Sequence, residues 1–425
     1  MAGVAKRRMA KSSDHAPPKA DVPKSGNKIG AVSASNAGIT HSEATQIVHH
    51  GRHPASQHGF VNTPVYRGST VLFPTLAKIK SRDQAFTYGR RATPTTVALE
   101  DAITSLAGGT KTILTSSGLN AVSTALLAFV QSGDHILMAD TVYQPTRTFC
   151  DKMLTRLGVE TTYYDPLTGC GIGTLVKANT RLIFVESPGS QTFEMQDIPA
   201  ISKIARAKDI WLLADNTWAS PLYSKPLGLG ADVSIEAATK YIVGHADALL
   251  GAVTANARAE KYIDNAKEAL GTCPGSEETY LALRGLRTLH VRLAHHMRSG
   301  LEMARWLEGR PEVARVLHPA LESHPGHAIW KRDFTGASGL FTIVLHPASE
   351  KALAAFLDGL QLFGMGYSWG GYESLIIPFD PKPYRTATGW TDAGPALRLH
   401  IGLEDVSDLK ADLEAAFSRL KAAIQ

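Results

Sequence analysis

Residues 231–251, with the sequence ADVSIEAATKYIVGHADALLG, contain a lysine in an unusually apolar setting. A short apolar run leads through small residues to Lys240, which is surrounded by Ala, Thr, Ile and Val. Two interpretations are open for this lysine. It can lie at a strand end and reach water along its aliphatic stem. Alternatively, it is kept partly desolvated, so that its amine is neutral often enough to form a Schiff base.

The composition narrows the class of protein. The chain has 425 residues, of which 44% are hydrophobic and 20% are charged, a profile typical of soluble globular proteins. This length predicts about two to three domains. The net charge is +5, and much of the excess lies in the first 28 residues, so the rest of the chain is close to neutral. Neither the charge nor any motif indicates a nucleic-acid-binding surface.

Cysteine usage and the N-terminus predict a cytoplasmic protein. The three cysteines, Cys150, Cys170 and Cys273, form no CxxC pair, and such a sparse, odd set is typical of a reducing compartment. No apolar run reaches membrane-spanning length, and the N-terminus lacks the apolar core of a secretory signal. Residues 1–42 are poor in large apolar groups, and we expect a disordered tail there in preference to an organelle transit peptide.

The middle of the chain alternates between short apolar strands and helices. This pattern predicts a mostly parallel sheet covered by helices on both faces, with the functional groups at the carboxyl ends of its strands. The expected strands are 111–115, 135–139, 161–164, 181–186, 210–214 and 231–236, and the expected helices are 120–130, 147–157 and 198–207.

The segments on either side of this alternation predict an arm and a second domain. Residues 43–91 are irregular, and we expect an N-terminal arm that contacts a neighbouring subunit. Residues 92–286 would form the main domain. One long helix is expected over 277–309, and residues 287–425 then mix strands and helices, which predicts a smaller α+β domain. Its expected strands are 314–317, 339–345, 374–377 and 396–401, and its expected helices are 350–362 and 406–424.

Three kinds of site are not supported. The sequence GCGIG at 169–173 does not follow a strand and open a helix, so a turn is favoured over a dinucleotide site. No GxxxxGK[ST] phosphate loop is present. The histidine pairs at 49–50 and 295–296 lack the acidic or cysteine partners of a metal site, so we expect no metal.

Residues that could form a binding site lie directly after the predicted strands. Ser117, Gly118 and Leu119 lie between a strand and a helix, where free backbone N–H groups suit a phosphate, although a simple helix cap is also possible. Tyr143 follows the next strand and places an aromatic ring at the same edge, although a partly buried loop tyrosine is the more common reason for such a residue.

Asp215 ends the apolar run 210–214, and a carboxylate leaving a buried strand needs a partner. A turn or a helix cap could supply that partner. Lys240 follows at the end of the next strand in the chain. A lysine, a carboxylate, a helix start that can bind phosphate and an aromatic ring, all at one edge of the predicted sheet, are the groups that pyridoxal phosphate requires. Each indication is weak alone, and the combination predicts a pyridoxal-phosphate enzyme.

Several motifs, in order along the chain, resemble the cysteine/methionine-metabolism family of pyridoxal-phosphate enzymes. They are Tyr88-Gly89-Arg90, Ser117-Gly118-Leu119, Asp215-Asn216-Thr217, the lysine motif SIEAATKY at 234–241 and RLHIG at 398–402. The resemblance covers about residue 47 to the C-terminus. It implies fold type I, the aspartate-aminotransferase-like α/β fold, with a seven-stranded, mostly parallel sheet in the cofactor domain and a smaller C-terminal α+β domain.

Within the family, GYSWGGYES at 366–374 and ESPGS at 186–190 resemble the branch of bacterial cystathionine β-lyases. The γ-lyases and γ-synthases typically carry Ser-Leu-Gly-Gly in place of the first motif. Ala237 departs from the serine of many relatives, and an alanine occurs in the β-lyase form. The implied activity is β-elimination of L-cystathionine to homocysteine, pyruvate and ammonia, a step of transsulfuration in methionine biosynthesis.

The resemblance also implies roles for individual residues. Lys240 and Tyr143 would be catalytic. The cofactor-binding residues would be Lys240, Asp215, Tyr143, Gly118, Leu119, Thr239, Tyr88 and Arg90, and the substrate-binding residues would be Arg398, Trp369, Ser368 and Tyr88. Because Tyr88 and Arg90 would reach the cofactor of a neighbouring subunit, a homo-oligomer, usually a tetramer in this family, is expected.

Three alternatives remain open: a broader cysteine-S-conjugate β-lyase or cysteine desulfhydrase, a cystathionine γ-lyase or γ-synthase, and a cofactor-free scaffold of the same fold.

Overall fold

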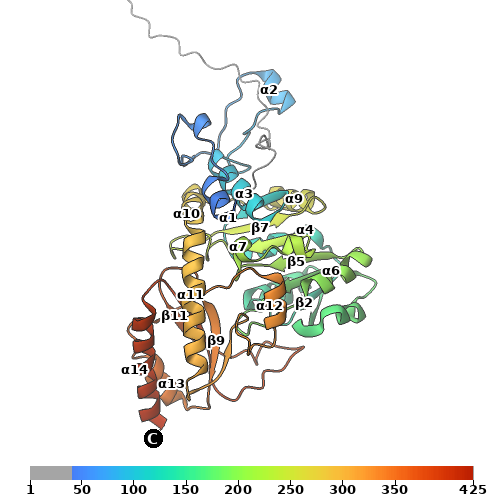
Figure 1. Ribbon diagram of the computed structural model, residues 1–425. Coiled ribbons are helices and arrows are strands. Elements are labelled where there is room, and N and C mark those ends of the chain that lie inside the picture. Colours follow the sequence, from blue (N-terminus) through green and yellow to red (C-terminus); the bar gives the residue numbers. More distant parts are fainter. Residues whose placement is uncertain (1–40, 425) are drawn as a thin grey trace, which may run out of the picture. The chain divides into compact units, whose positions relative to one another are not determined.

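The computed structural model describes residues 41–424, and their larger sheet has seven strands (Figure 1). All strands run in one direction except β7, which pairs antiparallel with both of its neighbours, β1 and β6. The mostly parallel sheet is therefore confirmed, whereas β7 was not expected as a strand. The order across the sheet is β1 (Lys111–Thr115), β7 (Gly251–Ala255), β6 (Val233–Glu236), β5 (Trp211–Asp215), β4 (Thr180–Glu186), β2 (His135–Ala139) and β3 (Glu160–Tyr164).

Helices bury both faces of this sheet. Every residue of β2 and of β7 is buried, as expected for central strands of a sheet with two covered faces. Strand β7 was not predicted because its sequence, GAVTA, is short and consists of small residues, without the alternation of apolar and polar residues that marks a strand. The helices beside the sheet include α3 (Pro94–Ala107), α4 (Gly118–Phe129), α6 (Ile198–Ala207), α8 (Pro226–Leu229) and α9 (Glu260–Leu270), and α7 (Ser220–Tyr223) packs on α3.

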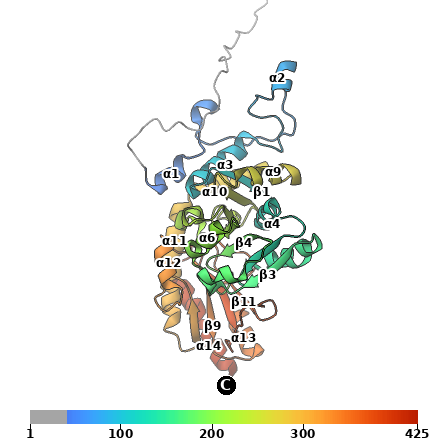
Figure 2. The ribbon, with the colours of Figure 1, turned by 90° about the vertical axis from the view of Figure 1, so that its right-hand side faces the viewer.

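A second, smaller sheet follows in the chain, and the views in Figures 1 and 2 both show its helices α13 and α14 next to the C-terminus. Its strand order is β10 (Gly364–Met365), β11 (Leu375–Phe379), β12 (Ala396–His400), β9 (Leu340–Leu345) and β8 (Val313–Leu317). Helices α13 (Glu350–Leu357) and α14 (Val406–Ile424) share an apolar core with these strands, and α12 (His327–Asp333) precedes β9. The expected mixture of strands and helices in this part of the chain is confirmed.

The single long helix expected over 277–309 is wrong. The structure has two helices, α10 (Ser276–Leu286) and α11 (Leu289–Glu308), separated at residues 287–288. Gly285 packs so closely on the turn after Lys240 that a Cβ there would lie 2.2 Å from the Val243 carbonyl oxygen. The Arg292 guanidinium donates to the Gly285 and Tyr241 carbonyls, at 2.7 and 2.8 Å. These contacts, on either side of the break, hold α10 and α11 against the turn that carries Lys240.

The expected helix over 147–157 is also shifted. The structure has α5 (Gln144–Thr148) followed by a π-helical turn (Phe149–Leu154), and β3 is preceded by a short turn. A 3₁₀ segment (Pro166–Leu175) occupies the region of the GCGIG sequence and contains a break at Gly169, where φ is +52°. This backbone conformation agrees with the turn that the sequence favours over a dinucleotide site.

Residues 41–91 contain only short helices: α1 (Glu43–His49), a 3₁₀ turn (Pro54–Gln57) and α2 (Leu76–Ser81). Figures 1 and 2 both show α2 projecting beyond the helices that cover the sheet. Large apolar side chains are exposed here, including Phe60 at 69% and Leu72 at 83%. The tail expected over residues 1–42 lies outside the described residues except for its last two, and the domain boundaries stay predictions. No helix among residues 41–424 is long and apolar enough to cross a membrane.

One buried carboxylate ties the two sheets together. Asp140 follows β2, and its carboxylate accepts hydrogen bonds from the backbone N–H groups of Thr386, Ala387 and Thr388 at 2.9–3.2 Å. Arg147 lies 2.8 Å away and also donates to the Thr386 hydroxyl. Burial raises the pKa of Asp140, but these hydrogen bonds outweigh burial and hold the pKa below its ordinary value. We call Asp140, Arg147 and residues 386–388 the clamp.

Asp140→Asn is expected to lower the free energy of unfolding by roughly 3–5 kcal/mol, because Arg147 would remain buried without its buried counter-ion. Denaturant unfolding measures this change. The matched control is Asp151→Asn, since Asp151 is half-exposed and lies 3.8 Å from the same arginine. A surface pair of this kind contributes less than about 1 kcal/mol. Equal losses in the two variants would contradict the clamp.

Candidate functional site

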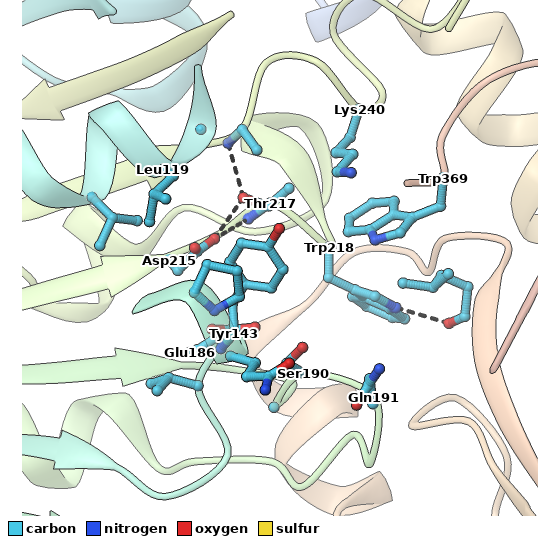
Figure 3. A pocket seen from close by; sticks show the side chains of 18 of the residues that line it. Leu119, Tyr143, Glu186, Ser190, Gln191, Asp215, Thr217, Trp218, Lys240 and Trp369 are labelled. Atoms are coloured by element: carbon cyan, nitrogen blue, oxygen red, sulfur yellow. Dashed lines mark hydrogen bonds between the residues drawn. The ribbon is translucent and has the colours of Figure 1, made fainter. Parts of the chain in front are cut away.

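A cavity of about 480 Å³ opens at the carboxyl ends of β4, β5 and β6, beside the N-terminus of α4 (Figure 3). The second sheet contributes to it through β12 and through residues 367–369. The structure brings together nine of the predicted site residues: Gly118, Leu119, Tyr143, Asp215, Thr239, Lys240, Ser368, Trp369 and Arg398.

Two predicted residues lie outside this cavity. Tyr88 is half-exposed in the N-terminal arm, and its backbone bridges to Thr70. The Arg90 guanidinium lies 3.7 Å from the Glu268 carboxylate at the end of α9. Neither residue reaches the cavity of its own chain, so the expectation that both serve a neighbouring subunit stays a prediction.

Lys240 lies in a turn four residues after β6, not at the strand end where the sequence predicted it. Its Nζ donates to the Ser368 hydroxyl at 2.7 Å and lies 5.1 Å from the centre of the Trp369 ring. Burial, followed by the positive charge of Arg398, lowers the pKa of Lys240 to about 8, while Asp215 acts in the opposite direction. Of the two interpretations of this lysine, the geometry favours the desolvated amine.

Asp215 is the last residue of β5, as predicted, and its carboxylate is oriented by Thr217. Oδ1 accepts from the Thr217 backbone N–H at 3.0 Å and from its hydroxyl at 2.6 Å. The same hydroxyl accepts from the Ala237 N–H at 2.9 Å, which links the β5 and β6 ends (Figure 3). Burial raises the pKa of Asp215, and the Thr217 hydrogen bonds and the Lys240 charge oppose that shift.

Sequence reasoning assigned no role to two further carboxyl groups at neighbouring strand ends. Glu186 ends β4 beside Asp215, and Glu236 ends β6. Burial and the nearby Asp215 charge raise the pKa of both groups well above the ordinary value, which favours their neutral forms. Glu186 also accepts from the Tyr143 N–H at 2.7 Å and so holds the turn that carries this ring. The position of both at strand ends was the signal that could have found them.

The start of α4 offers free hydrogen-bond donors. Ser117 caps the helix by accepting from the Asn120 N–H at 3.1 Å, which leaves the first N–H groups, of Gly118 and Leu119, without partners in the helix. A Cβ on Gly118 would lie 2.5 Å from the Ala237 side chain, so a glycine is required where α4 meets the β6 turn. Such a helix start attracts an anion.

Arg398, on β12, brings a guanidinium to the same cavity. One nitrogen donates to the carbonyls of Gly366 and Ser368, at 3.3 and 3.0 Å, and Nε is buried without a partner among residues 41–424. Burial lowers the pKa of Arg398 to about 10. The backbone of Ser368 has a positive φ of 74°, which is uncommon for a residue other than glycine. Arg398 therefore supports the strained turn that holds Lys240 and keeps donors free for a ligand.

Comparison with known proteins gives matches over most of the chain. The family described as "Cys/Met metabolism PLP-dependent enzyme" matches residues 44–418. A Rhizobium johnstonii protein is 53% identical over 391 residues, which cover 91% of this chain and 98% of that protein. Cystathionine beta-lyase MetC of Escherichia coli is 45% identical over 387 residues, covering 88% and 98%. The structure of cystathionine gamma synthase from Xanthomonas oryzae, in complex with aminoacrylate and cysteine, has a TM-score of 0.83 at 30% identity, covering 91% of this chain and all of that one.

In protein prepared without cofactor, we expect Lys240 to react with an amine-selective aldehyde at a rate that rises with pH, with a midpoint near pH 8, because only the neutral amine is nucleophilic. Rates of labelling, with the modified lysine identified by mass spectrometry, measure this midpoint. Arg398→Met should raise the midpoint by removing a neighbouring cation, and Asp215→Asn should lower it by removing an anion. A wild-type midpoint near that of a free lysine would overturn the assignment.

Proposed function

The chain belongs to the Cys/Met metabolism family of PLP-dependent enzymes, and from this membership we propose that it is a carbon–sulfur lyase. Its reaction is the β-elimination of L-cystathionine to homocysteine, pyruvate and ammonia, in agreement with the names of relatives such as the E. coli enzyme. The fold type I architecture is shared with the structure of the Xanthomonas synthase. The observation that carries the proposal is one cavity holding the Lys240 amine, the Asp215 carboxylate and the Arg398 guanidinium.

The cavity suits pyridoxal phosphate, the cofactor of the family. Free N–H groups at the start of α4, together with Thr239, would hold its phosphate. Asp215 would keep the pyridine nitrogen of the cofactor protonated, because the neighbouring carboxyl groups of Glu186 and Glu236 favour their neutral forms and leave Asp215 as the anion. Lys240 would attach it and Tyr143 would stack on its ring. When bound, this cofactor supplies an electron-withdrawing ring that acidifies the Cα proton of the attached amino acid.

The protein's own groups then position the substrate and move the proton. Arg398 would bind the α-carboxylate in the planar fork geometry that arginine offers. The Lys240 amine, once free, would accept the Cα proton, because a pKa of about 8 leaves part of the population neutral near neutral pH. Ser368, at 2.7 Å from Nζ, would hold the amine in place, and the Trp369 ring would limit access of water.

We also propose that the enzyme works as a homo-oligomer, usually a tetramer in this family. The arm exposes apolar side chains, among them Leu72 at 83% and Leu76 at 66%, and an exposed apolar group of this size is typical of an interaction surface. Tyr88 and Arg90 on the same arm would then reach the cofactor phosphate of the neighbouring subunit, and Tyr88 would also touch its substrate.

A cytoplasmic location completes the proposal. All three cysteines are free, two of them exposed, which fits a reducing compartment.

Turnover of L-cystathionine by the purified protein should give pyruvate and homocysteine in equal amounts. Identification of both carbon products by mass spectrometry decides the reaction. Formation of 2-oxobutyrate and cysteine would show γ-elimination and would overturn the β-lyase assignment. Comparison with simple cysteine conjugates on the same preparation separates a dedicated enzyme from a broader β-lyase or desulfhydrase.

Lys240→Ala serves as the control for a cofactor-free scaffold. The variant should lose turnover and the borohydride-reducible absorbance of the wild type. A wild-type protein without that absorbance, or an unchanged spectrum in the variant, would favour the scaffold.

Shared sites predict complementation between two inactive variants. Arg90→Ala subunits, mixed with Lys240→Ala subunits, should recover up to about a quarter of wild-type activity if each site draws on two chains, because random pairing gives half mixed dimers with one intact site each. Activity after subunit exchange, followed with differently tagged chains, measures the recovery. Absence of recovery in mixed oligomers that have exchanged would argue against a role for Arg90 in the neighbouring site.

A further inference from the structure

Arg385 lines the same cavity and has no part in the function proposed above. It lies in the segment between β11 and β12, and its side chain is only 4% exposed. The cavity therefore contains three cationic side chains, those of Lys240, Arg385 and Arg398. The first attaches the cofactor and the third binds the α-carboxylate, so the charge of Arg385 needs another explanation.

The environment of Arg385 leaves donors for a ligand. One nitrogen donates to the Thr192 hydroxyl and lies 3.0 Å from the Glu194 carboxylate, and neither partner lines the cavity. The counter-ion therefore lies behind the guanidinium. Arg385 Nε is enclosed by protein without a partner among residues 41–424, so it does not itself face the cavity. The contacts with Thr192 and Glu194 both use Nη2, and the other terminal nitrogen, Nη1, forms no hydrogen bond with residues 41–424 and remains for a ligand. Because a guanidinium carries five N–H donors in a fixed fork, a satisfied Arg385 requires further acceptors.

Hydrogen bonds on both sides hold Arg385 in place along the chain. The Tyr384 hydroxyl donates to the Gln191 side-chain oxygen at 2.7 Å. On the other side, the clamp holds the N–H groups of residues 386–388 on the Asp140 carboxylate. Figure 3 shows Gln191, the partner of Tyr384, on the side of the cavity away from Lys240. Arg385 is therefore fixed in the wall of the cavity, as a residue that selects substrates should be.

We propose that Arg385 binds a second carboxylate, on the leaving-group side of the substrate. This inference rests on the proposed function, in which Arg398 takes the α-carboxylate next to the reacting carbon. The substrate class is then a thioether amino acid whose departing half carries its own carboxylate. A planar guanidinium pairs with such a group in two parallel hydrogen bonds, and Glu194 keeps the fork oriented when the site is empty.

The test compares two substrates that differ in the departing half. L-cystathionine carries a carboxylate there, and S-ethyl-L-cysteine carries none. Arg385→Met should lower the ratio of their kcat/KM values by about 10- to 100-fold, the range expected for loss of a charge-assisted hydrogen bond, mainly through KM for L-cystathionine. Arg385→Lys should lower the ratio less. Arg398→Met is the matched control, since both substrates carry the α-carboxylate and the ratio should stay within about threefold.

A second measurement does not depend on turnover. In the Lys240→Ala background, calorimetry should show that Arg385→Met weakens binding of L-cystathionine more than that of S-ethyl-L-cysteine. Thermal unfolding of each variant checks that the fold is intact. Equal losses for both ligands in Arg385→Met and Arg385→Lys would show a merely structural arginine and overturn the inference. A wild type that binds L-cystathionine through Arg385 but yields other products would instead contradict only the proposed reaction.

Discussion

The close contact between the Lys240 turn and the second sheet is the constraint on which the rest of the structure depends. Nζ of Lys240 bonds to Ser368, and a Cβ on Gly370 would lie 2.9 Å from the Lys240 carbonyl carbon. An amine in this position loses most of its water, and burial is the first cause of its lowered pKa. The reactive group therefore exists only where the two sheets meet. The break between α10 and α11 serves the same contact, because Arg292 and Gly285 hold the turn from behind.

The surroundings of each carboxyl group near the cavity decide whether that group carries a negative charge. Three carboxyl groups stand at the ends of β4, β5 and β6, and burial makes it costly to ionise all of them together. Asp215 has the hydroxyl and N–H donors of Thr217 and the nearby Lys240 charge, so it is the carboxyl best able to remain negative. Glu186 uses its oxygen to hold the Tyr143 turn. One anion is thus placed in the same cavity as the lysine and the aromatic ring.

The segment between β11 and β12 connects the part of the cavity proposed to hold the cofactor with the arginine proposed to select the substrate. It reaches from the second sheet to the first, where Asp140 binds three of its N–H groups. Asp140 precedes Tyr143 by three residues, and Tyr384 and Arg385 precede the bound N–H groups directly. A change in the clamp would therefore disturb both Tyr143, which we propose stacks on the cofactor, and Arg385, which we assign to the substrate. Stability and specificity share the same hydrogen bonds here.

The sequence by itself determined the parallel sheet, Asp215 at a strand end and the lysine motif, because short apolar runs and neighbouring polar residues are local patterns. It also predicted nine of the residues that line one cavity. Only the tertiary structure decided which lysine environment is real, where α10 ends and α11 begins, and that Glu186 and Arg385 line the cavity, with Glu236 buried at the neighbouring strand end. These features arise from contacts between distant residues, such as Arg385 and Thr192, which are 193 positions apart. Burial and charge at such contacts depend on how the sheets meet, and no local pattern records that.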